Sequence, residues 1–296
     1  MTDQPRIGFI GLGVMGGAVA RRLSGAFPVR AFDANPEAIA RAAEAGAEAA
    51  ADAASAIGGA DFVMTSLPTP EIVEAFWAQH AAALEPGAIA VDLSTIDPST
   101  ARRIAELVEA GRAGGFVSCT LGRTPQHAER GEIPAFVGGP AEALTRLAPV
   151  LERMADSVHD MGSVEGATMF KLISNHIGMS NLVVLAEGYA LACRAGIRPE
   201  VFTAALRTTG GWSTQAEMRL PLMVDGDYAT RFAVDLAAKD LRLATDAAAR
   251  WHLPAPLGSA ALSVFSTASA SGHGGSDAAA VIEALDPRGD ARGRPS

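Results

Sequence analysis

The stretch from residue 11 to residue 16 constrains this chain more than any other part of its sequence. It reads Gly11-Leu12-Gly13-Val14-Met15-Gly16, with an apolar run before it and a helical pattern after it. Between a strand and a helix, three glycines so spaced allow a tight turn, a close approach of the backbone to a pyrophosphate, and close helix packing. The pattern therefore predicts a dinucleotide-binding turn in which all six of these residues contact the cofactor.

Asp33 supports this prediction and bears on the choice of cofactor. It lies 20 residues after Gly13, at the end of a second apolar stretch. A carboxylate there accepts hydrogen bonds from the ribose hydroxyls and repels a 2′-phosphate. The next residues, Ala34 and Asn35, carry no cation that would hold such a phosphate. The sequence predicts NAD rather than NADP, while an alternative role for Asp33 is an acid near the start of the next helix, at Pro36.

The first half of the chain alternates short apolar stretches with helical patterns. We expect strands at residues 6–10, 29–32, 62–66, 88–92, 116–117 and 135–137, and helices near 14–25, 36–46, 70–79, 98–113 and 140–155. This alternation is typical of βαβ units, so the predicted fold class is α/β with a mostly parallel, doubly wound sheet.

The second half of the chain has helical patterns only. A long one covers about residues 167–195, and shorter ones lie near 199–208, 213–224, 231–250, 256–270 and 276–284. We predict a dinucleotide-binding domain at 1–162, an all-α domain at 163–286, and a disordered tail at 287–296 that is rich in Gly, Pro and Arg. The long helix is apolar on most faces, which predicts burial against a second subunit in a homodimer or homotetramer.

Composition excludes several function classes. The formal net charge of −9 and the pI near 5.2 argue against nucleic acid and anionic membrane surfaces as partners. Two cysteines, Cys119 and Cys193, predict neither a disulfide framework nor a cysteine metal site, and the six histidines lack metal-ligand spacing. We therefore expect a protein without a bound metal. The first residues do not have the pattern of a signal peptide, so we also expect a cytoplasmic protein.

Lys171 is the main catalytic candidate from the residues alone. It lies near the start of the long, otherwise apolar helix, with Ser174 and Asn175 on the same face. A lysine in a closed cleft can protonate a carbonyl oxygen or accept a proton from an alcohol. The alternatives are a lysine at a helix end with its ammonium in water and, for Lys239, an exposed charge on an amphipathic helix.

Several loops follow the expected strands and thus face the ligand crevice of such a sheet. The loop Gly122-Arg123-Thr124 offers a guanidinium, a backbone N–H and a hydroxyl for a substrate anion, unless Arg123 is a surface residue of a turn. Leu67, Pro68 and Thr95 end two other strands, where they either contact the nicotinamide or belong to helix starts.

Taken together, these motifs resemble the 3-hydroxyisobutyrate dehydrogenase (β-hydroxyacid dehydrogenase) family over the chain to about residue 285. The matching pieces are the glycine turn, Leu67-Pro68, Asp92-Leu93-Ser94-Thr95-Ile96-Asp97-Pro98, Val137-Gly138-Gly139, Lys171-Leu172-Ile173-Ser174-Asn175 and Asp235-Leu236-Ala237-Ala238-Lys239-Asp240. The resemblance implies a Rossmann domain, an all-helical dimerisation domain, Lys171 as the catalytic acid/base, Asn175 as a substrate contact, and Lys239 beside the cofactor.

One departure from the family pattern concerns the substrate. The family's D-A-P-V-S-G-G stands here as Ser118-Cys119-Thr120-Leu121-Gly122-Arg123-Thr124. This G-R-T variant resembles sulfolactaldehyde reductases, in which a guanidinium would suit a three-oxygen sulfonate. Ser118 and Ser174 replace the family's usual aspartate and asparagine, which leaves other small anionic substrates open.

The predicted function is NAD(H)-dependent interconversion of a small anionic 3-hydroxy acid and its semialdehyde. The first specific candidate is 3-sulfolactaldehyde reduction, and the alternatives are oxidation of 3-hydroxyisobutyrate or reduction of tartronate, methylmalonate or succinic semialdehyde, the last giving 4-hydroxybutyrate. An imine reductase is a further enzyme alternative, and a non-catalytic dinucleotide sensor is an alternative of another class.

Overall fold

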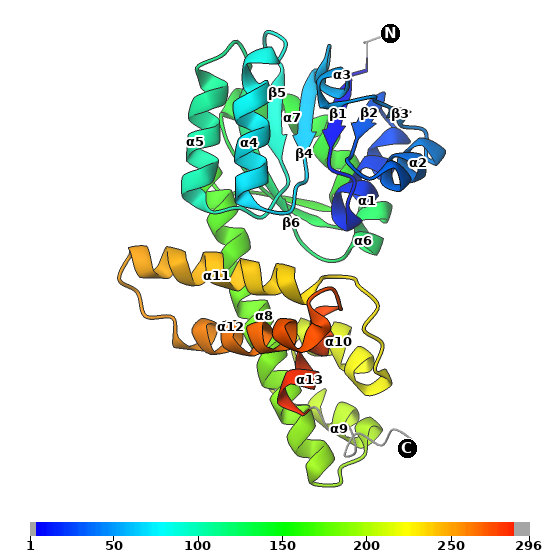
Figure 1. The fold of residues 1–296 in the computed structure, drawn as a ribbon, viewed down its shortest axis with the longest axis vertical. Helices are drawn as coiled ribbons and strands as arrows, with labels where there is room; N and C mark the ends of the chain where they lie inside the picture. Colours follow the sequence, from blue (N-terminus) through cyan, green and yellow to red (C-terminus); the bar gives the residue numbers. More distant parts are fainter. Residues whose placement is uncertain (1–3, 287–296) are drawn as a thin grey trace. The chain divides into compact units, whose positions relative to one another are not determined.

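The computed structural model describes residues 4–286, so the predicted disordered tail at 287–296 lies outside the described residues. The chain divides into two compact units, one up to Lys171 and one from Leu172. The helix α8 (Val164–Arg194) begins in the first unit and ends in the second (Figure 1). The predicted domain boundary between residues 162 and 163 falls just before this helix and stays a prediction.

The first unit is built on a sheet of eight strands within the described residues, in the order β3-β2-β1-β4-β5-β6-β7-β8. The strands are β1 (Ile7–Ile10), β2 (Val29–Phe32), β3 (Glu48–Ala49), β4 (Phe62–Thr65), β5 (Ile89–Asp92), β6 (Gly115–Leu121), β7 (Pro134–Gly138) and β8 (Ser157–Asp160). All neighbouring strands pair in parallel except β6 and β7, which are antiparallel. The prediction of a mostly parallel α/β sheet is confirmed.

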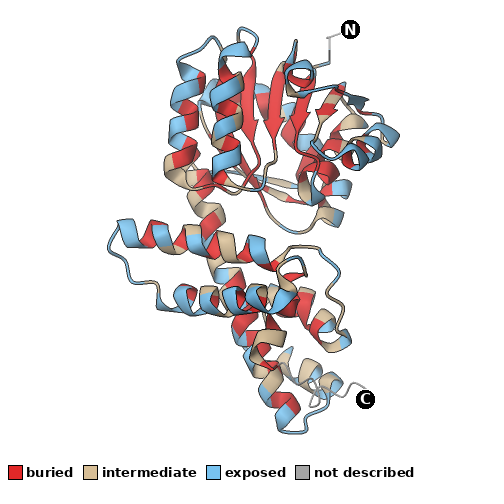
Figure 2. Ribbon diagram, viewed as in Figure 1, coloured by how far each residue is buried: buried red, intermediate tan, exposed pale blue. Residues whose placement is uncertain are grey.

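Helices cover both faces of this sheet. They are α1 (Val14–Ser24), α2 (Pro36–Glu44), α3 (Ala53–Ile57), α4 (Pro70–His80), α5 (Pro98–Glu109), α6 (Pro125–Arg130) and α7 (Ala141–Met154), with a 3₁₀ turn, η1 (Ala81–Ala83). Successive side chains of a strand point to opposite faces, so Phe9 packs in the cluster with α1 and α7 while Ile10 packs in the cluster with α3, α4 and α5. Figure 2 shows the central strands buried throughout, as expected for a sheet covered on both faces.

Three helices that follow strands start in the same way. Asn35, Thr69 and Asp97 are the N-cap residues of α2, α4 and α5, and each accepts a backbone N–H of the first turn through its side chain. A proline stands at the first helical position each time, where its missing N–H costs nothing. These starts fix where the chain leaves the carboxyl edge of the sheet, which is the edge that carries the candidate site.

The second unit is helical. Besides most of α8 it contains α9 (Pro199–Leu206), α10 (Thr214–Asp225), α11 (Val234–Arg250), α12 (Pro256–Ala268), a π-helical turn η2 (Ser269–His273), a 3₁₀ turn η3 (Ala278–Ala280) and α13 (Val281–Leu285). Its core gathers buried side chains of α8, such as Leu182 and Tyr189, against these helices. Asp277, fully buried, accepts the Arg219 guanidinium (3.3 Å) and the backbone N–H groups of Phe232 and Ala279, which joins three segments of the unit.

Several short strands and helices of the structure were not predicted from the sequence. The strands β3 and β8 and the helices α3 and α6 were not expected, and β6 extends well beyond residues 116–117. The helix expected at 276–284 is a 3₁₀ turn followed by a single short α-helix. Each missed element has two to six residues, too few for a hydrophobic period to show.

Candidate active site

The glycine turn joins β1 to α1 with the geometry that its sequence predicts. Gly11 has φ of +92°, and an added Cβ there would lie 2.2 Å from the Ser66 carbonyl oxygen. A Cβ on Gly16 would lie 2.3 Å from the Gly11 carbonyl oxygen, so this glycine permits the close packing of the helix on the turn. A Cβ on Gly13, in contrast, would meet nothing within 4 Å. The backbone at Gly13, the N-cap of α1, is therefore open to a ligand, which fits a bound pyrophosphate.

Asp33 links the glycine turn to the start of α2. Its Oδ2 accepts the Leu12 N–H at 2.6 Å, and its Oδ1 accepts the Asn35 N–H at 2.7 Å. The carboxylate is thus held at the carboxyl end of β2, where a ribose would meet it. Asp33 also supports the start of the helix, so the two roles left open by the sequence are compatible.

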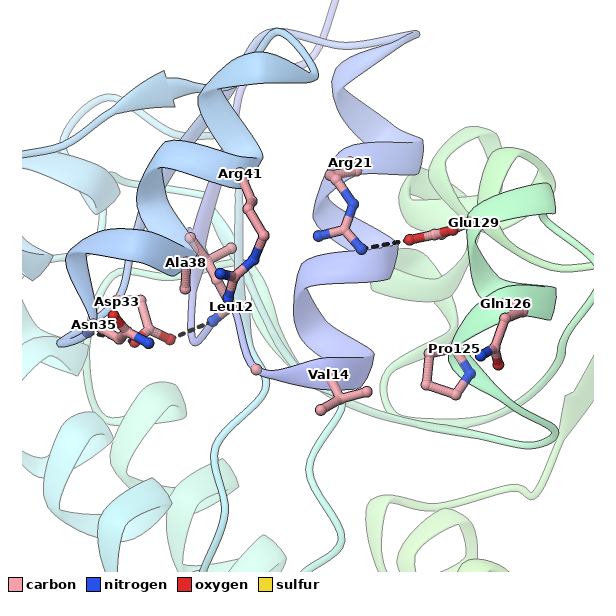
Figure 3. A pocket seen from close by; sticks show the side chains of 11 residues that line it. Leu12, Val14, Arg21, Asp33, Asn35, Ala38, Arg41, Pro125, Gln126 and Glu129 are labelled. Atoms are coloured by element: carbon pink, nitrogen blue, oxygen red, sulfur yellow. Dashed lines mark hydrogen bonds and ion pairs between the residues drawn. The ribbon is translucent and has the colours of Figure 1, made fainter. Parts of the chain in front are cut away.

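A pocket of about 540 Å³ lies beside this turn. Figure 3 shows its walls, which come from the glycine turn, α1, α2 and α6. The lining residues are Leu12, Gly13, Val14, Arg21, Asp33, Asn35, Ala38, Arg41, Pro125, Gln126 and Glu129. Of the predicted cofactor contacts, Leu12, Gly13, Val14 and Asp33 line it, and Gly11, Met15, Gly16, Leu67, Pro68, Thr95 and Lys239 do not. The volume, the open backbone and the acid fit the dinucleotide.

Two cations in this pocket were missed by the sequence reasoning. Arg41 stands on α2 and Arg21 on α1, where it forms an ion pair with Glu129 of α6 at 2.5 Å. The prediction of NAD rests on Asp33 and on the two uncharged residues that follow it, and neither arginine entered it. Arg41 lies eight residues after Asp33, in the second turn of α2, so reading the whole of this helix for cations would have found it.

A buried carboxylate orders the loops after β4 and β5. Asp92, which is 1% exposed, accepts the hydroxyls of Thr65 (2.6 Å) and Ser94 (2.7 Å) on Oδ1. The Ser94 hydroxyl oxygen in turn accepts the Leu67 N–H at 2.9 Å. Asp92 thereby positions the loops that contain Leu67, Pro68 and Thr95, a role that the sequence reasoning did not assign. Thr95 is half-buried and Pro68 is exposed.

Lys171 lies in the first unit, at the carboxyl end of β6. Its Nζ donates a hydrogen bond to the Leu121 carbonyl oxygen at 2.7 Å. The first turns of α8 are held to the sheet by the Thr120 hydroxyl, which donates to the Ala167 carbonyl (3.2 Å), and by the ring contact of Phe170 with Phe136. The ammonium is therefore partly buried and stands directly before the loop Gly122–Thr124.

This loop holds Arg123 in a way that the sequence did not predict. The residue has φ of +61°, and its Nη1 donates to the Glu132 carbonyl oxygen (2.5 Å) and forms an ion pair with Asp156. Hydrogen bonds from Ser157 first, and then from Arg123, hold the pKa of Asp156 below its ordinary value. The Thr124 hydroxyl lies 2.7 Å from His127 Nδ1. The Gly122 N–H donates to the Pro134 carbonyl oxygen at 3.0 Å. All three predicted anion contacts thus have partners within the protein.

In the second unit a single carboxylate joins two predicted site residues. Asn175 Nδ2 donates a hydrogen bond to Asp240 Oδ2 at 2.6 Å, and Asp240 Oδ1 lies 3.0 Å from Lys239 Nζ. Asp240 is 1% exposed and was not predicted as a site residue. Ser174, expected on the same face of α8 as Asn175, is exposed and has no place in this cluster.

The two lysines named here are also the whole lysine content of the sequence. Of the 24 basic residues, Lys171 and Lys239 are lysines and the other 22 are arginines. An arginine stays charged at every physiological pH, whereas a lysine can lose its proton in a suitable site. This composition was a usable signal that the sequence reasoning overlooked.

Other chemistry finds little support in residues 4–286. No group of three or more His, Cys, Asp or Glu side chains in that range could hold a metal ion. Both cysteines are buried, and burial raises the pKa of Cys119 to about 12, so that thiol is not a nucleophile. None of the described helices is long and apolar enough to cross a membrane.

Known proteins match this chain over almost its whole length. The family description "NAD binding domain of 6-phosphogluconate dehydrogenase" matches residues 6–162, and "NAD-binding of NADP-dependent 3-hydroxyisobutyrate dehydrogenase" matches residues 165–285. An L-threonate dehydrogenase of Cupriavidus necator is 35% identical, over 94% of this chain and 95% of its own length. A 3-sulfolactaldehyde reductase of Escherichia coli is 32% identical, with 94% of each chain covered.

A solved structure gives the same result. The Mycobacterium tuberculosis 3-hydroxyisobutyrate dehydrogenase with L-serine has a TM-score of 0.86 and 30% identity, and the match covers 96% of this chain and 99% of that one. The chain belongs to the 3-hydroxyisobutyrate dehydrogenase (β-hydroxyacid dehydrogenase) family, whose NAD-binding oxidoreductases act on CH–OH groups.

Proposed function

We propose that this protein interconverts a small anionic 3-hydroxy acid and its semialdehyde, with Lys171 as the general acid/base. The observation that carries the proposal is the hydrogen bond of Lys171 Nζ to the Leu121 carbonyl, directly before the Gly122–Thr124 loop. An ammonium there can give a proton to a carbonyl oxygen and, in the other direction, the amine can take one from a hydroxyl. NAD(H), when bound, supplies the hydride chemistry.

The lysine composition supports this assignment. Of the 24 Lys and Arg positions of the chain, all except Lys171 and Lys239 hold arginine, a group that supplies positive charge without titrating at physiological pH. A proton donor that must also act as an acceptor requires a different residue. Lys171 meets this requirement, and Lys239 is assigned to the cofactor side of the site.

The remaining site residues receive supporting roles in the proposal. Gly11 to Gly16, Asp33, Leu67, Pro68 and Thr95 contact the cofactor, and Gly122, Arg123 and Thr124 receive the substrate anion. Asn175 orients the substrate, and Ser174, which is exposed, is the second substrate contact assigned to α8. NAD is preferred to NADP because Asp33 opposes a 2′-phosphate, although Arg21 and Arg41 add positive charge to the same pocket.

The first specific substrate to test is 3-sulfolactaldehyde, because Arg123 offers a fork of donors to a sulfonate. The ion pair of Arg123 with Asp156 must open for this contact to form. L-threonate is the second candidate, since an L-threonate dehydrogenase is 35% identical to this chain, although the 2- and 3-hydroxyls of L-threonate are secondary and would give a keto acid in place of a semialdehyde. Tartronate, methylmalonate and succinic semialdehydes complete the panel.

The test is NADH oxidation with each aldehyde, and NAD⁺ reduction with L-threonate, by the parent and by Lys171→Met. We expect turnover by the parent and a loss of about 10²–10⁴-fold in kcat for the variant, because a positioned acid/base contributes that much. The variant should still bind NADH with the parent's affinity by fluorescence titration. Turnover of Lys171→Met at the parent's rate contradicts the proposal, and a parent that binds NADH but turns over nothing favours a sensor.

We also propose self-association through α8 and a cytoplasmic location. Four exposed apolar side chains, Ile173, Ile177, Val184 and Leu191, are spaced by four, seven and seven residues and thus form one stripe along the helix. A second copy of the chain can cover such a stripe through a two-fold axis. The cytoplasmic location rests on the acidic charge and the two buried, free cysteines.

A further inference from the structure

The side chain of Asp240 dictates which end of the Asn175 amide faces outward. A carboxylate only accepts hydrogen bonds, so Asn175 must give it an N–H, and the contact of 2.6 Å joins Nδ2 to Oδ2. The carbonyl Oδ1 of Asn175 then points away from Asp240. Within residues 4–286 no group donates a hydrogen bond to that carbonyl.

The ion pair with Lys239 holds Asp240 in this role. Lys239 Nζ lies 3.0 Å from Asp240 Oδ1, and both side chains are nearly buried, 12% and 2% exposed. This distance makes the two groups an ion pair. They are not aligned as a hydrogen bond, and Asp240 Oδ1 accepts no hydrogen bond within the described residues. The buried carboxylate thus contacts the ammonium on one oxygen and the Asn175 amide on the other.

We propose that Asp240 is a positioning residue that makes Asn175 an acceptor for a second hydroxyl group of the substrate. This inference rests on the proposed function, in which Asn175 contacts the substrate and Lys171 exchanges a proton with the reacting hydroxyl. Asn175 follows Lys171 by one turn of α8, so its carbonyl meets a different part of the molecule. The substrate class is then a 2,3-dihydroxy acid or sulfonate rather than a 2-methyl or 2-unsubstituted 3-hydroxy acid.

The substitution Asp240→Asn tests this polarity without changing the size of the side chain. Lys239 requires an oxygen at the position of Oδ1, so the new amide places its NH₂ group at the position of Oδ2. Asn175 must turn its own amide to accept from that group, and its NH₂ then faces outward. The variant therefore presents a donor where the parent presents an acceptor.

The probes are three pairs of compounds that differ only in the 2-hydroxyl. They are each enantiomer of glycerate with 3-hydroxypropionate, and 2,3-dihydroxypropane-1-sulfonate with 3-hydroxypropane-1-sulfonate. We expect the parent to favour the hydroxylated member of a pair by about tenfold or more in kcat/KM, because its absence leaves the carbonyl unpaired. In Asp240→Asn this ratio should fall to about one.

The reciprocal double variant Asn175→Asp/Asp240→Asn provides a rescue. It rebuilds an amide-to-carboxylate contact with the partners exchanged, and a carboxylate oxygen now faces outward as an acceptor. The preference for the hydroxylated compound should return. Repulsion between the new charge and the substrate anion affects both members of a pair equally, so the ratio is not distorted by it.

Asp246→Asn is the matched control, since Asp246 is an exposed acid on the same helix as Asp240. Thermal unfolding of each variant checks that the variant is folded. The control should keep the parent's ratio. A parent that oxidises both members of a pair equally, or an Asp240→Asn variant with the parent's ratio, overturns the inference and leaves the proposed function standing. A parent that oxidises none of these compounds also overturns the inference, whereas the proposed function is decided separately by turnover of the semialdehydes and L-threonate.

Discussion

At the scale of single residues, Arg123 illustrates how an assignment from sequence changes when contacts are known. Its guanidinium was predicted to bind a substrate anion, and in the structure it holds Glu132 and Asp156 instead. The pKa of Asp156 is lowered, so its stabilising contribution is present above the ordinary value of 3.8 and is lost as pH falls through the lowered pKa. The pair therefore persists at neutral pH, and the anion must compete with it.

Two substitutions separate an anion-binding role of Arg123 from a merely structural one. Arg123→Ala should raise KM for 3-sulfolactaldehyde by about tenfold or more, because a charge-assisted hydrogen bond is worth roughly 1.5–3 kcal/mol. Asp156→Asn should lower that KM, because the Asp156 carboxylate no longer competes with the substrate anion for Arg123. The decrease should be only about twofold, because an ion pair at an exposed position is weak. Steady-state kinetics and NADH titration measure both. If both variants raise KM alike, Arg123 only anchors the loop.

At the scale of elements, the turn between β1 and α1 separates folding from cofactor binding. A Cβ on Gly16 would collide with the Gly11 carbonyl, whereas a Cβ on Gly13 meets nothing. Gly16→Ala should therefore cost roughly 1–3 kcal/mol of unfolding free energy, as overpacking does. Gly13→Ala should fold like the parent but bind NADH about tenfold more weakly, because a methyl group enters the space of the pyrophosphate.

Thermal unfolding and fluorescence titration with NADH distinguish these two outcomes. The parent sets the reference for both measurements. A Gly13→Ala variant that binds NADH as tightly as the parent would remove the open backbone of Gly13 from the cofactor site. A Gly16→Ala variant with the parent's melting temperature would show that α1 can shift without cost.

At this scale, the sequence predicts those features that depend on residues close together in the chain. The glycine turn, the parallel strands and the proline starts of α2 and α5 depend on neighbouring residues, and these predictions are confirmed. The contact of Asn175 with Asp240 spans 65 residues, and no local pattern reveals it. The antiparallel strand β7 was read as one more strand, because a short apolar run does not show its direction.

At the scale of the whole molecule, the stripe on α8 carries a prediction about assembly. The parent should sediment as a dimer or a larger oligomer, and Val184→Glu, in the middle of the stripe, should shift it toward the monomer because a buried, unpaired charge is costly. Ile72→Glu, an exposed isoleucine of α4, is the matched control and should keep the parent's state. Sedimentation velocity measures all three. A monomeric parent would contradict the proposed association.

The short helix α6 has a consequence for anyone who wishes to redesign this enzyme. It begins at Pro125, immediately after the loop assigned to the substrate, and its Pro125, Gln126 and Glu129 line the pocket assigned to the dinucleotide. A replacement loop that shifts this helix also alters a wall of the pocket proposed for the cofactor. Selection for a new substrate will therefore change the nucleotide requirement as well, and libraries should be screened at several NADH concentrations.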